Sequence, residues 1–334
     1  MKSVGYFKPT TAAVEGALLN LETPRPVPLA HDVLVGVRAV SINPVDVKVR
    51  AARAGTPESP VILGFDGAGV VVEVGSSVTL FAPGDEVWWA GDRNRAGSNA
   101  EFQLVDERIV ARKPQSLNFA EAAAMPLTTL TAWEALFESL RVTRDERGVI
   151  LIIGGGGGVA SMAIQLARRL TNLTVVATSS RPQTQAWVRE LGAHHVIDHR
   201  QPLAEQMRSL NLPFADYVFA TTHAGEHWPQ MVEVARPRGR MALIEGPDQF
   251  NLRLMADKSL TVSWELMFTR PTQQPGDMIV QHHILTEVAR LVDEGVLRTT
   301  AQQNLGRINA ANLIAAHAIS ESGRALGKLV LADW

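Results

Sequence analysis

The pattern of hydrophobic and polar positions changes along this chain and divides it into three regions. Residues 1 to about 118 are rich in valine with frequent glycine and proline, as in segments 33–40 and 69–75. This texture predicts short strands joined by tight turns. From about 119 to 265, short apolar runs alternate with helix-like segments, which predicts a parallel sheet covered by helices. The remainder contains an amphipathic helix around 278–294 and ends in a strand-like segment at 327–331.

The middle region contains six apolar runs that we interpret as strands. They lie at 149–153, 174–177, 195–198, 217–220, 240–244 and 260–263. In a doubly wound sheet, ligands bind beyond the carboxyl ends of the strands. The residues that follow these runs are therefore candidate ligand contacts, at 179–181, 199–200, 221–222, 245–246 and 264–268.

Five consecutive glycines, Gly154 to Gly158, follow the first of these strands and precede a helix-like segment. Backbone without side chains at a helix N-terminus lets a pyrophosphate approach the free N–H groups and the positive end of the helix dipole. The frame Gly155-x-Gly157-x-x-Ala160 fits a dinucleotide-binding turn, and the strand and helix around it favour this interpretation over a flexible linker. The run is longer than this fingerprint needs, since Gly154 and Gly156 stand where side chains are usually allowed.

Composition and charge narrow the class of protein. The 334 residues include 32 basic and 34 acidic residues, so no long-range attraction to nucleic acid or to an anionic membrane is expected. The chain has no cysteine, which excludes disulfides, thiolate catalysis and every cysteine-based zinc site. Residues 1–8 lack the apolar stretch of a signal peptide, and no apolar run reaches bilayer-spanning length. We therefore expect a cytoplasmic protein.

The end of the second middle-region strand bears on the choice of cofactor. A carboxylate there would accept hydrogen bonds from a ribose 2′-hydroxyl, whereas an arginine would hold a 2′-phosphate. The segment reads Thr178, Ser179, Ser180, Arg181 and contains no acid. We therefore expect NADPH, with Arg181 as the main anion contact and the two serine hydroxyls as its partners.

The chain resembles the medium-chain dehydrogenase/reductase superfamily, in particular its quinone oxidoreductase-like branch. The resemblance runs nearly end to end, and the stretch 180–270 is similar to a bacterial subgroup labelled zinc-type alcohol dehydrogenase-like. It rests on the order and spacing of the segments 41–46, 64–69, 74–75, 83–87, 100–102, the glycine turn, 191–193 and 327–328. The resemblance implies an α/β fold with a Rossmann NADP-binding domain at 120–265. A GroES-like β-barrel catalytic domain would comprise 1–119 and 266–334, and a homodimer would form through the edge strand around 260–263.

The resemblance also implies where catalytic zinc would lie. In zinc-dependent members of the superfamily, three ligands stand at positions that correspond here to Asn43, Phe65 and Leu127. An amide, a phenyl ring and an aliphatic chain do not provide the donors that zinc requires. Histidine pairs at 194–195 and 282–283, and His223 with His227, are more typical of polar surface or loop positions than of a metal site. We therefore predict an enzyme without a metal.

Without a Lewis acid, electron-poor hydride acceptors are favoured over simple alcohols. The expected reaction is hydride transfer from NADPH to a quinone or an α,β-unsaturated carbonyl, with Asn43 as the donor to the substrate oxygen. Asp46 would hold the loop or orient Asn43. Lys48 is a further candidate, as a proton donor or a contact for an acidic substrate, with a solvated surface charge as the favoured alternative. His199 stands where related reductases carry a tyrosine near the adenine ribose, and Thr131 would contact the nicotinamide ribose.

Together these arguments give a set of candidate cofactor contacts: Thr131, Gly155, Gly157, Gly158, Val159, Ser179, Ser180, Arg181, His199, Thr221, Gly246, Phe268 and Lys328. Two other functions stay open at the level of the sequence. One is an alcohol or aldehyde dehydrogenase with an unrecognised metal site. The other is a non-catalytic NADPH-binding sensor.

Overall fold

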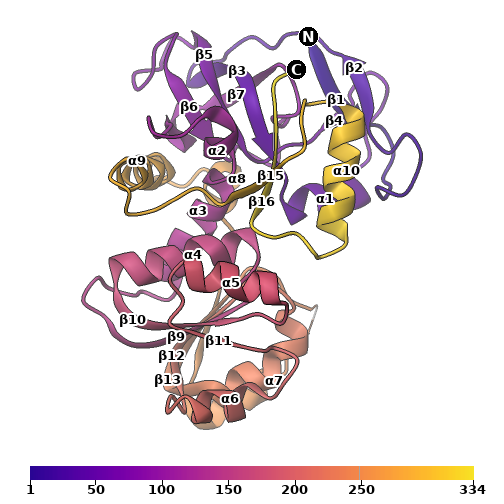
Figure 1. The fold of residues 1–334 in the computed structure, drawn as a ribbon. Coiled ribbons are helices and arrows are strands. Elements are labelled where there is room, and N and C mark those ends of the chain that lie inside the picture. The colour runs from indigo at the N-terminus through magenta and orange to yellow at the C-terminus, as the bar shows by residue number, and fades with distance from the viewer. Residues whose placement is uncertain (248) are drawn as a thin grey trace. The chain divides into compact units, whose positions relative to one another are not determined.

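The structure is a computed structural model that describes residues 1–247 and 249–334. Contacts between residues divide the chain into two units (Figure 1). Unit 1 comprises Met1–Leu130 together with Phe268–Trp334, and unit 2 comprises Thr131–Met267. The contacts thus group residues 120–130 with unit 1, whereas the sequence interpretation began the cofactor domain at residue 120.

Unit 2 is built on a parallel sheet of six strands in the order β11-β10-β9-β12-β13-β14. All six predicted strands are confirmed, although β13 begins five residues earlier than expected, and β14 forms an edge of the sheet as expected. The strands are β9 (Arg147–Ile153), β10 (Asn172–Thr178), β11 (His195–Ile197), β12 (Ala215–Ala220), β13 (Ala235–Leu243) and β14 (Thr261–Trp264).

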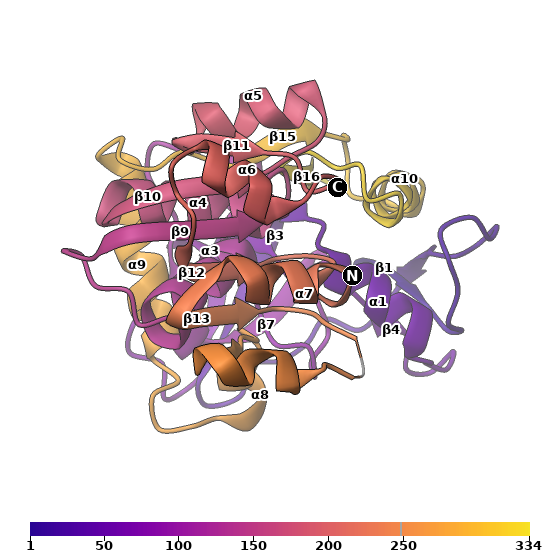
Figure 2. The same cartoon turned by 90° about the horizontal axis from the view of Figure 1, so that it is seen from below.

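Helices cover both faces of this sheet, as the alternation of strands and helices in the sequence predicts. Figure 1 shows α4 (Gly158–Leu170) and α5 (Pro182–Glu190) on one face, with α6 (Leu203–Ser209) and α7 (Ala224–Val234) on the other. Figure 2 views the molecule from the side that carries α6 and α7. Successive strand residues point to opposite faces, so Leu151 and Ile153 pack toward Met207 and Met231 of α6 and α7. This confirms the Rossmann-like, doubly wound architecture.

The strand order creates a switch point at β9. From β9 the chain continues to β10 and β11 on one side, and then returns to add β12 and β13 on the other side. In sheets of this kind the connections diverge at the switch point and leave a crevice beyond the carboxyl ends of the strands. The glycine turn after β9 and the loop after β12 therefore flank the expected ligand position.

Unit 1 contains a small antiparallel sheet and a larger, strongly curved one. The small sheet has the order β2-β1-β4, and the larger one has the order β15-β16-β3-β5-β6-β8 with β7 also paired to β3. The strands are β1 (Lys2–Tyr6), β2 (Leu19–Glu22), β3 (Asp32–Ser41), β4 (Val61–Ile62), β5 (Gly67–Val74), β6 (Glu86–Trp89), β7 (Phe102–Asp106), β8 (Val110–Arg112), β15 (Ala301–Asn304) and β16 (Lys328–Ala332).

The long strand β3 accounts for the curvature of the larger sheet. Its first half pairs with β7, its end pairs with β16, and β5 runs along most of its length. Two register shifts interrupt the pairing with β5, between Leu34 and Val35 and between Val37 and Ala39, and such bulges bend a strand. The strongly bent β core expected for a GroES-like domain is confirmed.

The helices of unit 1 lie around these sheets (Figure 1). The predicted amphipathic helix at 278–294 is confirmed as α9 (Val280–Asp293), and α3 (Pro126–Trp133) begins in unit 1 and is followed by the π-helical turn η2 (Glu134–Ser139). No helix in the described residues is long and apolar enough to cross a bilayer. The remaining helical segments are α1 (Pro44–Ala52), η1 (Glu107–Ile109), α2 (Phe119–Ala123), η3 (Leu252–Lys258, in unit 2), α8 (Thr269–Gln273) and α10 (Ala310–Glu321).

Candidate functional site

A buried carboxylate, Asp66, organises the polar cluster of unit 1. It lies just before β5 and is 0% exposed. Its Oδ2 accepts hydrogen bonds from Ser41 Oγ at 2.7 Å and from Asn43 Nδ2 at 2.7 Å. Its Oδ1 accepts from the backbone N–H of Leu127 at 2.8 Å. A carboxylate buried in this way is stabilised only if such donors, and a compensating charge, surround it.

Lys328 supplies that charge. The antiparallel pairing of β16 with the end of β3 brings this residue, the first of β16, beside residues 42 and 43. Its Nζ lies 3.0 Å from Asp66 Oδ2, 2.5 Å from Asn43 Oδ1 and 2.7 Å from the carbonyl oxygen of Ile42. Burial lowers the pKa of the Lys328 ammonium, and the Asp66 carboxylate opposes that shift. An ammonium has three donor hydrogens, so these three acceptors satisfy it within the protein.

Lys328 was expected to contact the cofactor. In unit 1 it is 3% exposed, and its three donors are directed at protein acceptors, so it is part of the cluster around Asn43. We name the set Ser41, Asn43, Asp66 and Lys328 the Asp66 cluster.

The Asp66 cluster fixes the orientation of the Asn43 amide. Asn43 Oδ1 accepts a hydrogen bond from the Lys328 ammonium, and Asn43 Nδ2 donates one of its two hydrogens to the Asp66 carboxylate. Reversing the amide would place an NH₂ group against an ammonium, so the two charged neighbours select a single orientation. The amide group has a second hydrogen, which is the candidate donor to a substrate oxygen.

Asp46 holds the backbone rather than the side chain of Asn43. One carboxylate oxygen accepts from the backbone N–H of Asn43 at 2.9 Å and the other accepts from the N–H of Gly64 at 3.0 Å. The backbone N–H of Asp46 donates in turn to Asn43 O at 3.0 Å, and this reciprocal contact begins α1. The bond from Gly64 ties α1 to the loop before Phe65. Complete burial raises the pKa of Asp46 to about 7, and the two backbone hydrogen bonds oppose that shift. Lys48, two residues further along α1, is exposed.

The residues at the three positions corresponding to zinc ligands do not fit a zinc ion. Both polar atoms of the Asn43 side chain are engaged within the Asp66 cluster. The ring of Phe65 packs edge-on against Phe268, with ring centroids 5.3 Å apart. Leu127 contributes its backbone N–H alone, to Asp66. An ammonium, an amide and two apolar side chains provide no set of lone pairs for a divalent metal.

The glycine turn of unit 2 has no side chains, and neighbouring atoms leave little space for any. Gly157 precedes the first turn of α4 without a side-chain cap, and hydrogen bonding within the helix starts with the Ser161 N–H donating to Gly157 O. The earlier N–H groups of Gly158 and Val159 therefore lie where a phosphate would accept from them. A Cβ on Gly155 would lie 2.8 Å from the carbonyl oxygen of Thr178, so a side chain at this position would force the turn apart.

Gly154 corrects one expectation from the sequence. It was assigned to a position that tolerates side chains, but its φ is +88°, a conformation that favours glycine. A Cβ there would also lie 2.7 Å from Thr221 Oγ1 and 2.7 Å from Thr222 Cγ2. Thr221 in turn donates through its backbone N–H and its hydroxyl to Ile153 O, at 3.1 and 2.7 Å. The loops after β9 and β12 are therefore in direct contact, and Gly154 is required for that contact.

The loops after β10 and β11 also meet at the carboxyl edge of the sheet. Arg200 donates from Nη2 to Ser180 O at 3.3 Å. Ser179 is buried and its hydroxyl pairs with Thr184, so it shapes the loop, whereas Ser180 and Arg181 are partly exposed beside it. Arg181 is the residue that precedes α5.

The other predicted cofactor contacts lie in different surroundings. His199 is partly exposed, and Gly246 is an exposed residue beyond the end of β13. Thr131 is buried within α3, and Phe268 is buried in unit 1 against Phe65. Gly155, Gly157, Gly158, Val159, Ser180, Arg181, His199 and Thr221 thus belong to the loops and helix start at the carboxyl edge of one sheet.

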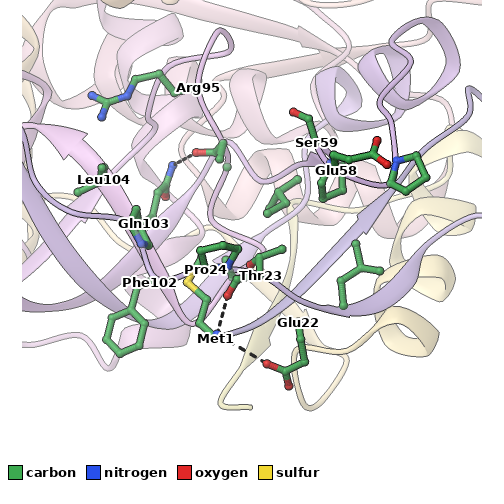
Figure 3. A pocket seen from close by; sticks show the side chains of 18 of the residues that line it. Met1, Glu22, Thr23, Pro24, Glu58, Ser59, Arg95, Phe102, Gln103 and Leu104 are labelled. Atoms are coloured by element: carbon green, nitrogen blue, oxygen red, sulfur yellow. Dashed lines mark hydrogen bonds and ion pairs between the residues drawn. The ribbon is translucent and has the colours of Figure 1, made fainter.

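Unit 1 also contains an open cavity of about 370 Å³, lined partly by four prolines (Figure 3). Two of the cationic groups that line it are paired within the unit. Arg95 forms two hydrogen bonds to Asp32, at 2.8 and 3.0 Å, and the Met1 ammonium donates to Thr23 O at 2.7 Å. These pairings give no indication of the ligand class, and we assign none.

Comparison with known proteins places both units in one family. Residues 29–115 match the alcohol dehydrogenase GroES-like domain, and residues 191–331 match the zinc-binding dehydrogenase family. A zinc-type alcohol dehydrogenase-like protein of Staphylococcus aureus is 38% identical over 338 residues, covering 99% of each chain. The crystal structure of a putative zinc-dependent alcohol dehydrogenase from Rhizobium etli has 51% identity and a TM-score of 0.96, covering 100% of this chain and 98% of that one. A 2-methylene-furan-3-one reductase of Solanum lycopersicum is 37% identical over 241 residues, which is 69% of this chain and 59% of the reductase.

The chain therefore belongs to the medium-chain dehydrogenase/reductase superfamily, whose members are NAD(P)-dependent oxidoreductases. Within that superfamily it is similar to the bacterial zinc-type alcohol dehydrogenase-like proteins.

Proposed function

We propose that this protein is a zinc-independent, NADPH-dependent reductase that transfers hydride to a quinone or an α,β-unsaturated carbonyl. The observation that carries the proposal is the Asn43 amide, which Asp66 and Lys328 hold in one orientation at a position where zinc-dependent relatives have a metal ligand. This arrangement offers a hydrogen-bond donor where a Lewis acid would otherwise act.

The electronic requirement of the reaction matches such a donor. When a conjugated carbonyl or a quinone accepts a hydride at carbon, negative charge develops on its oxygen, and a proton from solvent completes the reduction. When bound, NADPH supplies the hydride. The second N–H of Asn43 stabilises the developing charge, and because Asp66 and Lys328 already fix the amide, little reorganisation is needed during the reaction.

The choice of NADPH rests on the loops of unit 2. The segment after β10 contains Ser180 and Arg181 and no carboxylate, so a 2′-phosphate meets a cation there without repulsion from an acid in that segment. The bare turn at Gly154 to Gly158 fits the pyrophosphate. The similarity to the tomato 2-methylene-furan-3-one reductase supports a reductase of conjugated carbonyl compounds.

A substrate panel tests the proposal. NADPH oxidation would be followed with 1,4-quinones, enones, and simple aldehydes as a comparison. We expect turnover with the first two classes. Asn43→Ala should lower kcat about 100-fold, a typical loss for one donor to a developing oxyanion. The control is Asn94→Ala, at an exposed position of unit 1. Binding of NADPH without turnover of any acceptor would favour a sensor, and turnover of aldehydes alone would favour an alcohol dehydrogenase.

We also propose a cytoplasmic homodimer that pairs through β14. This strand is an edge of the unit 2 sheet, and its last residue, Trp264, is 54% exposed. An edge strand presents unpaired backbone groups that a second copy can satisfy. Light scattering of the purified protein should give twice the chain mass, and Val262→Pro, which removes one N–H from the edge, should yield monomers. A monomer in the unsubstituted protein would contradict this assignment.

A further inference from the structure

Three histidines gather near the loops that would face the cofactor. His199 follows β11, His223 follows β12, and His227 lies in the first turn of α7. The rings of His199 and His227 are 5.9 Å apart between centroids and meet at 75°. Because Arg200 bonds to Ser180, the loop that carries His199 lies directly against the loop that carries Arg181.

His227 has an unsatisfied atom. The residue is 9% exposed, and its Nδ1 has no hydrogen-bond partner within the described residues. A buried polar atom without a partner is destabilising, so such an atom commonly marks a place that a ligand completes. An imidazole nitrogen without a partner can take up a proton and then donate to an anion.

The charges around the two rings are mixed. His199 faces Asp198, Arg200 and His223, and His227 faces His199, Glu226 and His223. Arg200 is engaged with Asp198 at 2.6 to 3.1 Å, which largely neutralises that carboxylate. His223 is exposed, and its backbone N–H donates to Glu245 Oε1 at 2.6 Å. Burial lowers the pKa of both His199 and His227, which favours the neutral form of both rings.

We propose that His199 and His227 form a proton-linked binding site for a phosphate monoester, the 2′-phosphate of NADPH. This inference rests on the cofactor choice made above and adds to it. Binding the phosphate transfers a proton from solvent to the histidine pair, and the resulting imidazolium donates to a phosphate oxygen. No other bond is made or broken. The preference for NADPH over NADH then depends on pH.

The direction of that dependence distinguishes this site from one built on arginine alone. A phosphate monoester loses its second proton near pH 6, so a site with a fixed cation binds it equally or more tightly as pH rises. A site that must take up a proton binds it more weakly as pH rises, by roughly tenfold per pH unit for one proton. The two cases are separated between pH 6.5 and 8.

Calorimetric titration tests the proposal directly, using NADP⁺ and NAD⁺ because the oxidised forms are stable at low pH. In buffers of different ionisation enthalpy, NADP⁺ should bind with uptake of up to one proton. Its affinity should fall about 10- to 30-fold from pH 6.5 to 8 while that of NAD⁺ stays constant. His199→Asn should at least halve the uptake, and the double variant His199→Asn/His227→Asn should abolish it.

The matched control is His195→Asn, at the opposite end of β11. Circular dichroism would establish folding of each variant. Because His199 is only half-buried, its single variant tests the proposal even if a variant of the buried His227 fails to fold. NADP⁺ affinity that is flat or rises with pH in the unsubstituted protein would overturn the proposal. So would proton uptake that is undiminished in His199→Asn.

Inorganic phosphate serves as a second probe. Phosphate that competes with NADP⁺ and not with NAD⁺, with the same proton uptake, would support the site. Phosphate binding that is accompanied by proton uptake but does not compete with NADP⁺ would refute the assignment of this site to the cofactor. Failure of the proposed reductase activity would leave these binding results unchanged, so the two proposals fail separately.

Discussion

The Asp66 cluster of unit 1 and the carboxyl edge of the unit 2 sheet differ in how completely their polar groups are paired. In the cluster, Lys328 and the Asp66 carboxylate are paired inside the protein, and one amide is held rigid between them. At the edge of the unit 2 sheet, the glycine turn has no side chains, and His227 Nδ1 has no hydrogen-bond partner among the residues that the structure describes. A closed network favours a preorganised donor, whereas an incomplete one favours a ligand that supplies the missing acceptor. Under the proposed function, the chain thus separates orientation of the hydrogen-bond donor from binding of the cofactor.

The largest expected effect comes from removing the Lys328 charge from the Asp66 cluster. Lys328→Met leaves the buried Asp66 carboxylate without its counter-charge, which should lower the free energy of unfolding by roughly 3–5 kcal/mol. Urea denaturation would measure this loss. Lys328→Met/Asp66→Asn should recover part of it, since no unpaired charge remains. Lys8→Met is the control at an exposed lysine. A loss below about 1 kcal/mol in the single variant would show that the pair is not the core of the cluster.

A second buried pair in unit 1 predicts a pH dependence of stability. His317 is completely buried, and its Nδ1 accepts from Arg50 at 2.7 Å. Burial, with a smaller contribution from Arg50, lowers the pKa of His317 from 6.5 to about 3. Between these values the unfolded chain binds more protons than the folded one, so the free energy of unfolding falls as pH drops through this window.

Each pKa unit corresponds to about 1.4 kcal/mol, so the histidine should contribute on the order of 2–4 kcal/mol to the loss between pH 6.5 and pH 3. Denaturation of His317→Asn across this range should show a correspondingly shallower slope than the unsubstituted protein. Equal slopes would mean that His317 does not titrate between the folded and unfolded states as described.

At the carboxyl edge of the unit 2 sheet, we expect a substitution to change cofactor preference rather than stability. Arg181→Ala should weaken NADPH binding about 10- to 100-fold, because a charge-assisted contact contributes roughly 1.5–3 kcal/mol. NADH binding should change less than about twofold. Fluorescence titration measures both affinities, with Arg189→Ala, an exposed arginine near the end of α5, as the control. An Arg181→Ala variant that retains its NADPH affinity would remove this residue from the site.

The smallest expected effect concerns Lys48. It is exposed on α1, on the helix that Asp46 anchors, and solvent can supply the proton that completes the reduction. Turnover of Lys48→Met should stay within about twofold of the unsubstituted enzyme on every active substrate. A tenfold loss in kcat that grows with pH would instead identify Lys48 as a proton donor.

The local parts of this fold could be predicted from the sequence. Apolar runs located all six strands of the unit 2 sheet because buried parallel strands are continuously hydrophobic. The glycine run located the turn after β9, although the positive φ of Gly154 follows from its contact with Thr221, which the pattern does not encode. Resemblance to the superfamily selected Asn43 as the candidate donor.

The partners of Asn43 could not be predicted in the same way. Asp66 is 23 residues from Asn43 and 262 from Lys328, and no local pattern links them. An acidic residue among glycines, between apolar segments, was the available signal for Asp66. His227 was interpreted as a loop histidine, and its burial against His199 depends on how α7 packs. Long-range pairing of polar groups is a property of the tertiary structure, which residue spacing alone does not determine.

If the oriented Asn43 amide takes the place of a metal ion, the enzyme should work without one, and metal removal tests this most directly. The protein would be dialysed against a chelator, its zinc content measured by elemental analysis, and its NADPH-dependent turnover of a 1,4-quinone compared before and after. We expect zinc far below one equivalent and unchanged turnover. Turnover that disappears with the metal and returns when Zn²⁺ is added would contradict the account.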